Sequence, residues 1–171
     1  MPKRIIDAGV SKIMKYINIL QSNIKISTDK EKYFAGEIIH AEIELKLGAQ
    51  INARALEINL NCIQTKRIKS MREMDQYDYR LDKEIGIPRS THLRTIISEK
   101  TETIYSEIKK IIANGKFSSE KFNIEFEIPW GAKSTKKNFD YDETKRFWRI
   151  DAKLDIPQAM DISASKKIEI I

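Results

Sequence analysis

Very few side chains in this sequence could act as a nucleophile, a general base or a metal ligand. The chain has two histidines, His40 and His92, and one cysteine, Cys62. The histidines fall on different predicted elements, and neither belongs to an H-x-x-x-H motif or a Cys/His cluster. His40 lies on the polar side of a predicted strand and Cys62 on the apolar side of another, where a free cysteine usually packs as a small hydrophobe. These residues favour a protein that is not an enzyme and that uses no metal or cofactor.

Two acidic stretches, DQYDY at 75–79 and DYDE at 140–143, have side chains that could hold a cation. Neither has the D-x-[DN]-x-[DN]-G pattern of a calcium loop, in which glycine allows a sharp turn between oxygen ligands. The six glycines are not clustered, and no G-x-x-x-x-G-K-[ST] or G-x-G-x-x-G motif is present, so a phosphate cradle of backbone amides is not expected. Both stretches are interpreted as solvated loops.

Nucleic-acid binding would require aromatic and basic side chains that are interleaved on one face. The best match is KRFWR, from Lys145 to Arg149. Trp148, however, is in register with Leu154 on the apolar face of a predicted strand, and we therefore expect it in the core. Phe147 would then point outward beside Arg149. No nucleic-acid partner is predicted.

The elements that would position these residues are mostly strands, because apolar and polar residues alternate over several stretches. In the clearest stretch, 39–47, every second residue is apolar. Similar alternation predicts strands at 24–28, 56–65, 93–98, 122–128, 148–156 and 168–171. Residues 103–112 fit a helix or a strand, and their neighbours favour a strand. Residues 5–20 repeat apolar side chains at steps of three and four, which predicts an amphipathic helix.

About seven alternating strands with turns between them predict an all-β fold, an immunoglobulin-like antiparallel β-sandwich. The predicted organisation is an N-terminal amphipathic helix, 1–22, followed by the sandwich, 23–171. Residues 69–92 are highly charged and have no sustained period, so we expect a long loop there. The candidate recognition residues of this loop are Arg72, Tyr77, Tyr79 and Arg80.

The composition allows one globular domain with a sizeable core in 171 residues. A net charge of +6 invites acidic partners, but the 31 basic residues are interspersed with 25 acidic ones, as is typical of solvated faces. We expect a cytoplasmic protein, because the sequence shows no membrane span, no secretory signal and only one cysteine. The high content of Ile, Lys and Glu is similar to that of thermophilic proteins.

Two segments together resemble the arrestin-like superfamily. STDKEKYFAGEIIHAEIEL, within 24–60, looks like the opening of an arrestin N-type domain, with a strand, then Y-x-x-G-E, then a second strand. FNIEFEIPW and WRIDAKLDIPQAMDISASKKIEI, within 122–170, look like the family's F-x-F-x-x-P and W-x-x-x-A-x-L-D-I-P patterns. The bacterial and archaeal sporulation-control arrestin-like group is the most similar in appearance. The matching positions, which the resemblance implies are architectural, are Tyr33, Gly36, Glu37, Pro129, Trp148, Leu154, Asp155, Pro157 and Asp161.

The resemblance implies a non-enzymatic adaptor or scaffold that binds other proteins, often at membranes. Full arrestins have two such sandwiches, whereas this chain has the length for one, so the phosphate-sensing arrangement of visual-type arrestins does not carry over. An exposed edge strand or the 69–92 loop would supply the binding surface. The edge strand and the N-terminal helix are also the candidate contacts of a homo-oligomer.

Two alternatives remain open from the sequence. The first is peripheral attachment to an anionic membrane surface through the N-terminal helix, with Lys3, Arg4, Lys12 and Lys15 beside its apolar stripe. The same stripe could instead pack on the sandwich or on a second subunit. The second alternative is a small-ligand binder or enzyme with a site in the sandwich.

Overall fold

The computed structural model describes residues 21–73, 93–112, 115–139 and 143–171, which contain ten strands and no helix. The predicted helix at 5–20 lies outside the described residues. The strands are β1 (Asn23–Thr28), β2 (Lys32–Tyr33), β3 (Ile38–Lys46), β4 (Ile51–Asn52), β5 (Ala55–Glu73), β6 (Leu93–Ile111), β7 (Lys116–Phe117), β8 (Lys121–Glu127), β9 (Thr144–Asp155) and β10 (Ile162–Ile170).

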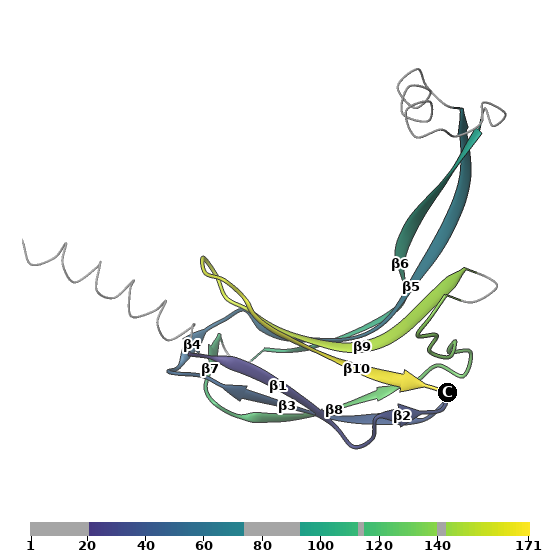
Figure 1. Ribbon diagram of the computed structural model, residues 1–171. Coiled ribbons are helices and arrows are strands. Elements are labelled where there is room, and N and C mark those ends of the chain that lie inside the picture. The colour runs from purple at the N-terminus through teal and green to yellow at the C-terminus, as the bar shows by residue number, and fades with distance from the viewer. Residues whose placement is uncertain (1–20, 74–92, 113–114, 140–142) are drawn as a thin grey trace, which may run out of the picture.

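Two sheets face each other and form a sandwich (Figure 1). One sheet has the order β1-β3-β8 and the other the order β2-β10-β9-β5-β6, while β4 and β7 form a short pair at one end. The predicted all-β sandwich is therefore confirmed. The strand pairs are antiparallel except for β2 and β10, which run parallel. Alternation could not reveal this exception, because side chains have a period of two in both kinds of sheet.

The core lies between the two sheets and follows the predicted alternation. Burial alternates residue by residue along β3 and β9. Trp148 is 1% exposed, which confirms its expected place in the core, and Cys62 is fully buried on the inner face of β5. The largest side chains that fill the space between the sheets are Trp148, Tyr33, Phe117, Phe126, Ile39, Ile43, Leu45, Leu56, Ile58, Leu60, Ile128 and Ile150.

β5 is longer than the sequence predicts, because it ends at Glu73 and not near Thr65. Its neighbour β9 pairs with it only as far as Lys66, and residues 66–70 are exposed on both faces. A strand without a buried face needs no apolar alternation, so its sequence carries no strand signal. The prediction of a loop over 69–92 is therefore wrong for residues 69–73, which belong to β5. The rest of that stretch, 74–92, lies outside the described residues.

β6 and β10 also differ in extent from the predicted strands. β6 joins 93–98 and 103–111 into one strand, which confirms the strand interpretation of 103–112 and shows that the helix alternative is wrong. β10 begins at Ile162 and not at Ile168. Its first half pairs Ala164 with Ala152, and such small side chains give little apolar contrast between the two faces. β4 and β7 lie in stretches that the sequence predicts to be turns.

The turn before β3 depends on Gly36 and Glu37. Gly36 has a φ of +84° and donates its N–H to the carbonyl of Ile128 (2.9 Å). The carboxylate of Glu37 accepts the backbone N–H of Phe34 (2.9 Å), and this bond, with the ammonium of Lys30, lowers the pKa of Glu37. These contacts fix the point at which β3 leaves the turn.

Replacing Gly36 by alanine is expected to lower the free energy of unfolding by about 1–2 kcal/mol, because a left-handed backbone is unfavourable for residues with a Cβ. A Cβ at Gly36 would also lie 2.7 Å from the ring of Trp130, which would have to move. Gly131→Ala is the matched control, since a Cβ there meets no atom within 4 Å. Urea denaturation of both variants measures the difference, and equal stabilities would contradict the prediction.

Candidate functional site: a free strand edge and a basic pocket

The most prominent surface feature is a two-stranded ribbon that leaves the sandwich (Figure 1). It comprises Arg67–Glu73 of β5 and Leu93–Glu99 of β6, which pair with each other beyond the end of the β5–β9 pairing. We call these residues the arm. The predicted recognition residue Arg72 lies in the arm opposite Arg94, whereas Tyr77, Tyr79 and Arg80 lie outside the described residues.

β6 forms the outer edge of the five-stranded sheet over all of its 19 residues. No strand in the described part of the chain pairs with its second side, here called the β6 edge. None of residues 95–112 is buried, and Ile97 and Ile108 are 58% and 55% exposed. The other exposed isoleucines in this segment are Ile96, Ile104 and Ile112.

The five-stranded sheet has more strands than the sheet that faces it, so the inner face of β6 is not fully covered. The side chains of β6 that share the inner face with Cys62, Ile58 and Leu56 are only partly buried. One of them is Lys109, which covers part of the gap. Its ammonium lies 5.1 Å from the ring of Phe126 and donates to the carbonyl of Glu125. β6 therefore extends beyond β8, the strand of the other sheet that lies nearest to it. Its second side presents unpaired backbone groups to a partner.

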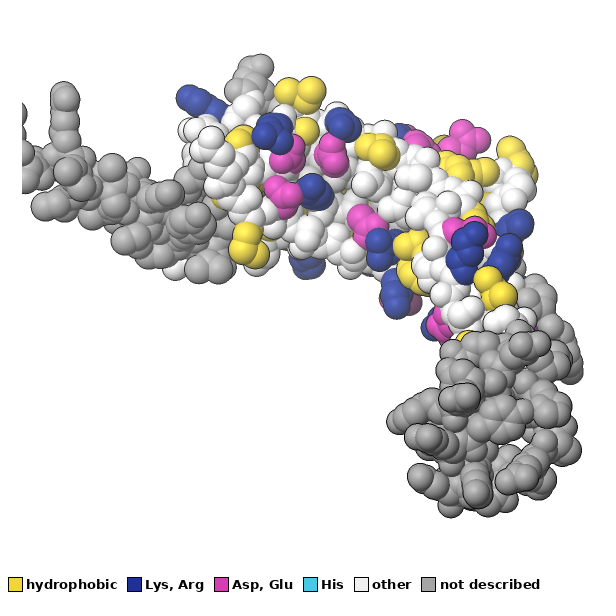
Figure 2. All heavy atoms as spheres, turned by 90° about the horizontal axis from the view of Figure 1, so that it is seen from above, with side chains coloured by type: hydrophobic (Ala, Val, Ile, Leu, Met, Phe, Trp, Pro, Cys, Tyr) yellow, Lys and Arg dark blue, Asp and Glu magenta, His cyan; other side chains and the backbone are white. Residues whose placement is uncertain are grey.

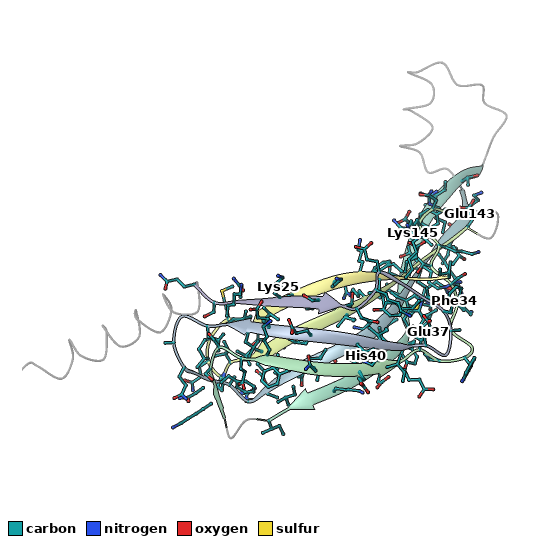
Figure 3. The ribbon with its side chains drawn as sticks, turned by 90° about the horizontal axis from the view of Figure 1, so that it is seen from below. Lys25, Phe34, Glu37, His40, Glu143 and Lys145 are labelled. Carbon is teal, nitrogen blue, oxygen red and sulfur yellow. The ribbon has the colours of Figure 1, made fainter. Side chains whose placement is uncertain are left out.

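Contacts with the segment before β9 hold the base of the arm. Glu143 accepts the N–H of Arg67 with its carbonyl and the ammonium of Lys69 with its carboxylate, both at 2.8 Å. The Lys69 contact lowers the pKa of Glu143. The guanidinium of Arg67 lies 3.7 Å from the centre of the Phe139 ring. Figure 3 shows Glu143 and Lys145 together at the base of the arm, at the opposite end of the sandwich from Lys25.

A pocket of about 520 Å³ lies close to this base, where β9 and β10 separate. The two strands pair as far as Trp148 and Ile168. Beyond that point the segment 133–136 lies between them and bonds to both. Lys136 exchanges two backbone hydrogen bonds with Arg146 (2.9 Å each), and Thr135 donates its N–H to the carbonyl of Ile170 (2.8 Å). The inserted segment thus brings three distant parts of the chain to one pocket.

The lining of this pocket, here called the basic pocket, is dominated by positive charge. It includes Lys136, Lys137, Lys145, Arg146, Lys166 and Lys167, against the two carboxylates of Glu31 and Glu169. Phe147 contributes an aromatic wall, with the ammonium of Lys167 at 5.3 Å from its ring centre. The five lysines come in short basic doublets that are spread over 136–167, so the sequence alone gives no sign that they meet. Figure 2 shows that acidic and basic side chains are interspersed over most of the outer face, in contrast to the composition of this lining.

Arg146 is the buried member of this group and is only 7% exposed. Its Nε and Nη2 donate to Oε1 of Gln64 at 3.2 and 3.0 Å, and Nη1 donates to the carbonyl of Ser134 at 3.0 Å. All of these acceptors are neutral, and no described carboxylate lies within ion-pair distance of the guanidinium. A buried charge is usually paired, and an unpaired one raises the positive potential around it.

The family positions implied by the sequence resemblance take part in packing and turns, and none of them lines the basic pocket. Tyr33 is fully buried and donates its hydroxyl to Asp29 at 2.7 Å. Asp161 accepts the N–H of Ile156 at 3.0 Å and pairs with Lys153 at 2.9 Å. The remaining positions are Gly36 and Glu37 in the turn, Pro129 after β8, Trp148 and Leu154 in the core, Asp155 in an ion pair with Arg54, and Pro157 after β9.

The candidate catalytic residues are not brought together. His40 is exposed on β3 and lies 3.2 Å from Glu125, while Cys62 is buried and belongs to the other sheet. Burial raises the pKa of the Cys62 thiol to about 11, so it is protonated at neutral pH. In the described ranges no group of three or more His, Cys, Asp or Glu side chains is arranged to hold a metal ion. No helix among the same residues is long and apolar enough to cross a membrane. His92 and the lysine and arginine residues of the predicted helix, Lys3, Arg4, Lys12 and Lys15, lie outside the described residues.

No family model matches the chain, and no curated protein matches its sequence. Among solved structures, the chain is similar to the crystal structure of Spo0M, a sporulation control protein from Bacillus subtilis, with a TM-score of 0.52 and 18% identity. The match covers 88% of this chain and 49% of Spo0M, so the chain spans about half the length of that protein. This likeness concerns the fold, and it supports the arrestin-like fold that the sequence resemblance implied.

Proposed function

We propose that the chain is a non-enzymatic arrestin-like adaptor that binds another protein along the β6 edge. The observation that carries this proposal is the unpaired outer edge of a 19-residue strand, together with its exposed isoleucines. Backbone N–H and C=O groups on such an edge can add a strand from a partner, while neighbouring side chains provide specificity.

The side chains of the β6 edge suit a protein partner. Five exposed isoleucines in 96–112 offer apolar anchors, and charged side chains of both signs lie among them. These are Glu99, Lys100, Glu102, Glu107, Lys109 and Lys110. Natural edge strands are usually short, or are protected by proline or bulges, because a long apolar edge otherwise promotes aggregation. β6 is long and contains no proline, and its register with β5 shifts at one point, where Ile104 has no partner. Most of this edge is therefore unprotected, which favours an edge that a specific partner covers.

Capture from a native lysate tests the proposal, with the double variant Ile104→Lys and Ile108→Lys compared with the wild type. Both side chains are exposed, so the substitutions are expected to leave the thermal midpoint unchanged. We expect the wild type to retain one stoichiometric protein and the variant to bind that protein at least about tenfold more weakly, because two lysines would lie in the apolar contact. Met160→Lys is the matched control, since Met160 is 74% exposed on the turn between β9 and β10.

Two results would contradict the adaptor function. One is that no stoichiometric partner is retained, or that the double variant retains it as well as the control does. The other is that light scattering finds a dimer of the purified chain and that the double variant abolishes it, because the β6 edge would then be an interface between copies of this chain.

A further inference from the structure

The basic pocket carries an inference that is independent of the adaptor function. Within its lining, six lysine and arginine side chains face two carboxylates. Glu169 is already engaged, since it pairs with Lys137 at 3.1 Å and with Lys32 at 3.8 Å. Lys145 and Lys166 form no ion pair with any described residue. Lys145 and Lys166 therefore contribute positive charge to the pocket that no described carboxylate neutralises.

The buried guanidinium of Arg146 adds to this positive charge. It lines the pocket but has only the neutral oxygens of Gln64 and Ser134 as acceptors. Water screens its charge poorly because the side chain is buried, so the guanidinium adds to the field of the surrounding lysines. An anion in the pocket would be attracted both by the guanidinium and by the surrounding lysines.

We propose that the basic pocket binds a compact polyanion of small-molecule size that carries three or more negative charges. Several lysine ammonium groups from separate segments can each contact a different oxygen of such a ligand. The volume of about 520 Å³ lies in the range of small-molecule sites and is well below the size of a protein interface. Phe147 gives the ligand an apolar surface at one side. Phosphate and carboxylate groups both meet this description.

Calorimetry with inorganic tripolyphosphate and with citrate, at an ionic strength held constant with chloride, tests the site on the full chain. We expect saturable one-to-one binding of at least one of these probes, with an affinity that falls as salt is added. The double variant Lys145→Met and Lys166→Met removes the two lysines without ion pairs and should weaken binding about thirty-fold. Its thermal midpoint without ligand should stay unchanged or rise, because like charges have been removed.

Lys25→Met with Lys116→Met is the charge-matched control, since both side chains are exposed and lie outside the lining. It should bind the probes as the wild type does. The proposal is overturned if neither probe binds saturably, or if the control weakens binding as much as the pocket variant, because the net charge would then be responsible. Vesicles of phosphatidylglycerol provide a further arm. Binding of vesicles without binding of the free probes would also overturn the proposal and assign these lysines to a membrane surface.

Discussion

Replacing Gln64 by leucine is expected to lower the free energy of unfolding by about 3 kcal/mol, although leucine is apolar and suits a buried position. Gln64 is 3% exposed, and its Oε1 accepts two of the hydrogen bonds that the buried guanidinium of Arg146 donates. Its Nε2 donates to Glu102 at 3.3 Å. Leucine would leave a buried cation with the carbonyl of Ser134 as its acceptor among the described residues, and removing the partner of a buried charge is among the most destabilising single changes.

A double-mutant cycle separates this cause from a simple loss of packing. Arg146→Met alone should cost about 1–2 kcal/mol, because it removes the guanidinium donors from two neutral oxygens, those of Gln64 and Ser134. The double variant has neither polar group. Its loss in the free energy of unfolding should therefore be close to that of Arg146→Met and well below the sum of the two single losses. Guanidinium chloride unfolding measures all three variants, with Gln21→Leu at an exposed position as the control. Additive losses would show that the two side chains are not energetically coupled.

The coupling between Gln64 and Arg146 could not be predicted from the sequence. Both residues lie on the inner face of strands whose other inward side chains are mostly apolar, and they pair across β5 and β9. Alternation predicts that position 146 faces inward, in register with Trp148, but apolar patterning gives no reason for a buried arginine there. Its burial depends on Gln64, which is 82 residues away in the sequence, and on the inserted segment 133–136.

The sequence predicts those parts of the fold where burial imposes a period of two. β3, β8 and β9 are examples, because each has one face against the core and one face in water. The sequence pattern does not predict a strand where neither face of that strand is buried. In the β5 half of the arm, residues 67–70 are exposed on both faces, and this stretch therefore resembles a charged loop. The sequence predicts that an exposed edge strand exists but not which strand it is. That depends on the order of strands in the sheet, which a local pattern does not contain.

The sequence does not reveal the basic pocket, for a related reason. Its lysines come from the segment after β8, from the start of β9 and from β10, and each contributes a short doublet that is typical of solvated surfaces. They meet because segment 133–136 lies between β9 and β10 beyond the end of their pairing and bonds to both. Trp148 holds this segment in place. Its position in the alternating pattern indicates only that it lies in the core.

Trp148→Ala is expected to lower the free energy of unfolding by about 4 kcal/mol, because it removes the largest fully buried side chain in the described part of the protein. The side chain is 1% exposed, and its ring lies 5.4 Å from that of Tyr105. Its indole Nε1 donates to the carbonyl of Lys133 at 2.9 Å. Trp148→Phe keeps an aromatic ring in the core but leaves this carbonyl without the indole donor, so about 1–2 kcal/mol of the loss should remain.

The phenylalanine variant tests whether Trp148 also positions the basic pocket. If the bond to Lys133 holds the inserted segment, hydrogen exchange at the amides of Thr135 and Lys136 should accelerate in Trp148→Phe, while the amides of β3 are unchanged. The affinity for tripolyphosphate should fall as well, although Trp148 does not line the pocket. Tyr105→Phe is the control, because it keeps the ring beside Trp148 and removes only a hydroxyl that donates to Glu107. Burial and the Glu107 carboxylate raise the pKa of Tyr105 to about 12, so the variant changes no charge at neutral pH. Equal exchange rates in the two variants would show that the indole donor contributes to stability alone and does not hold the lysines in place.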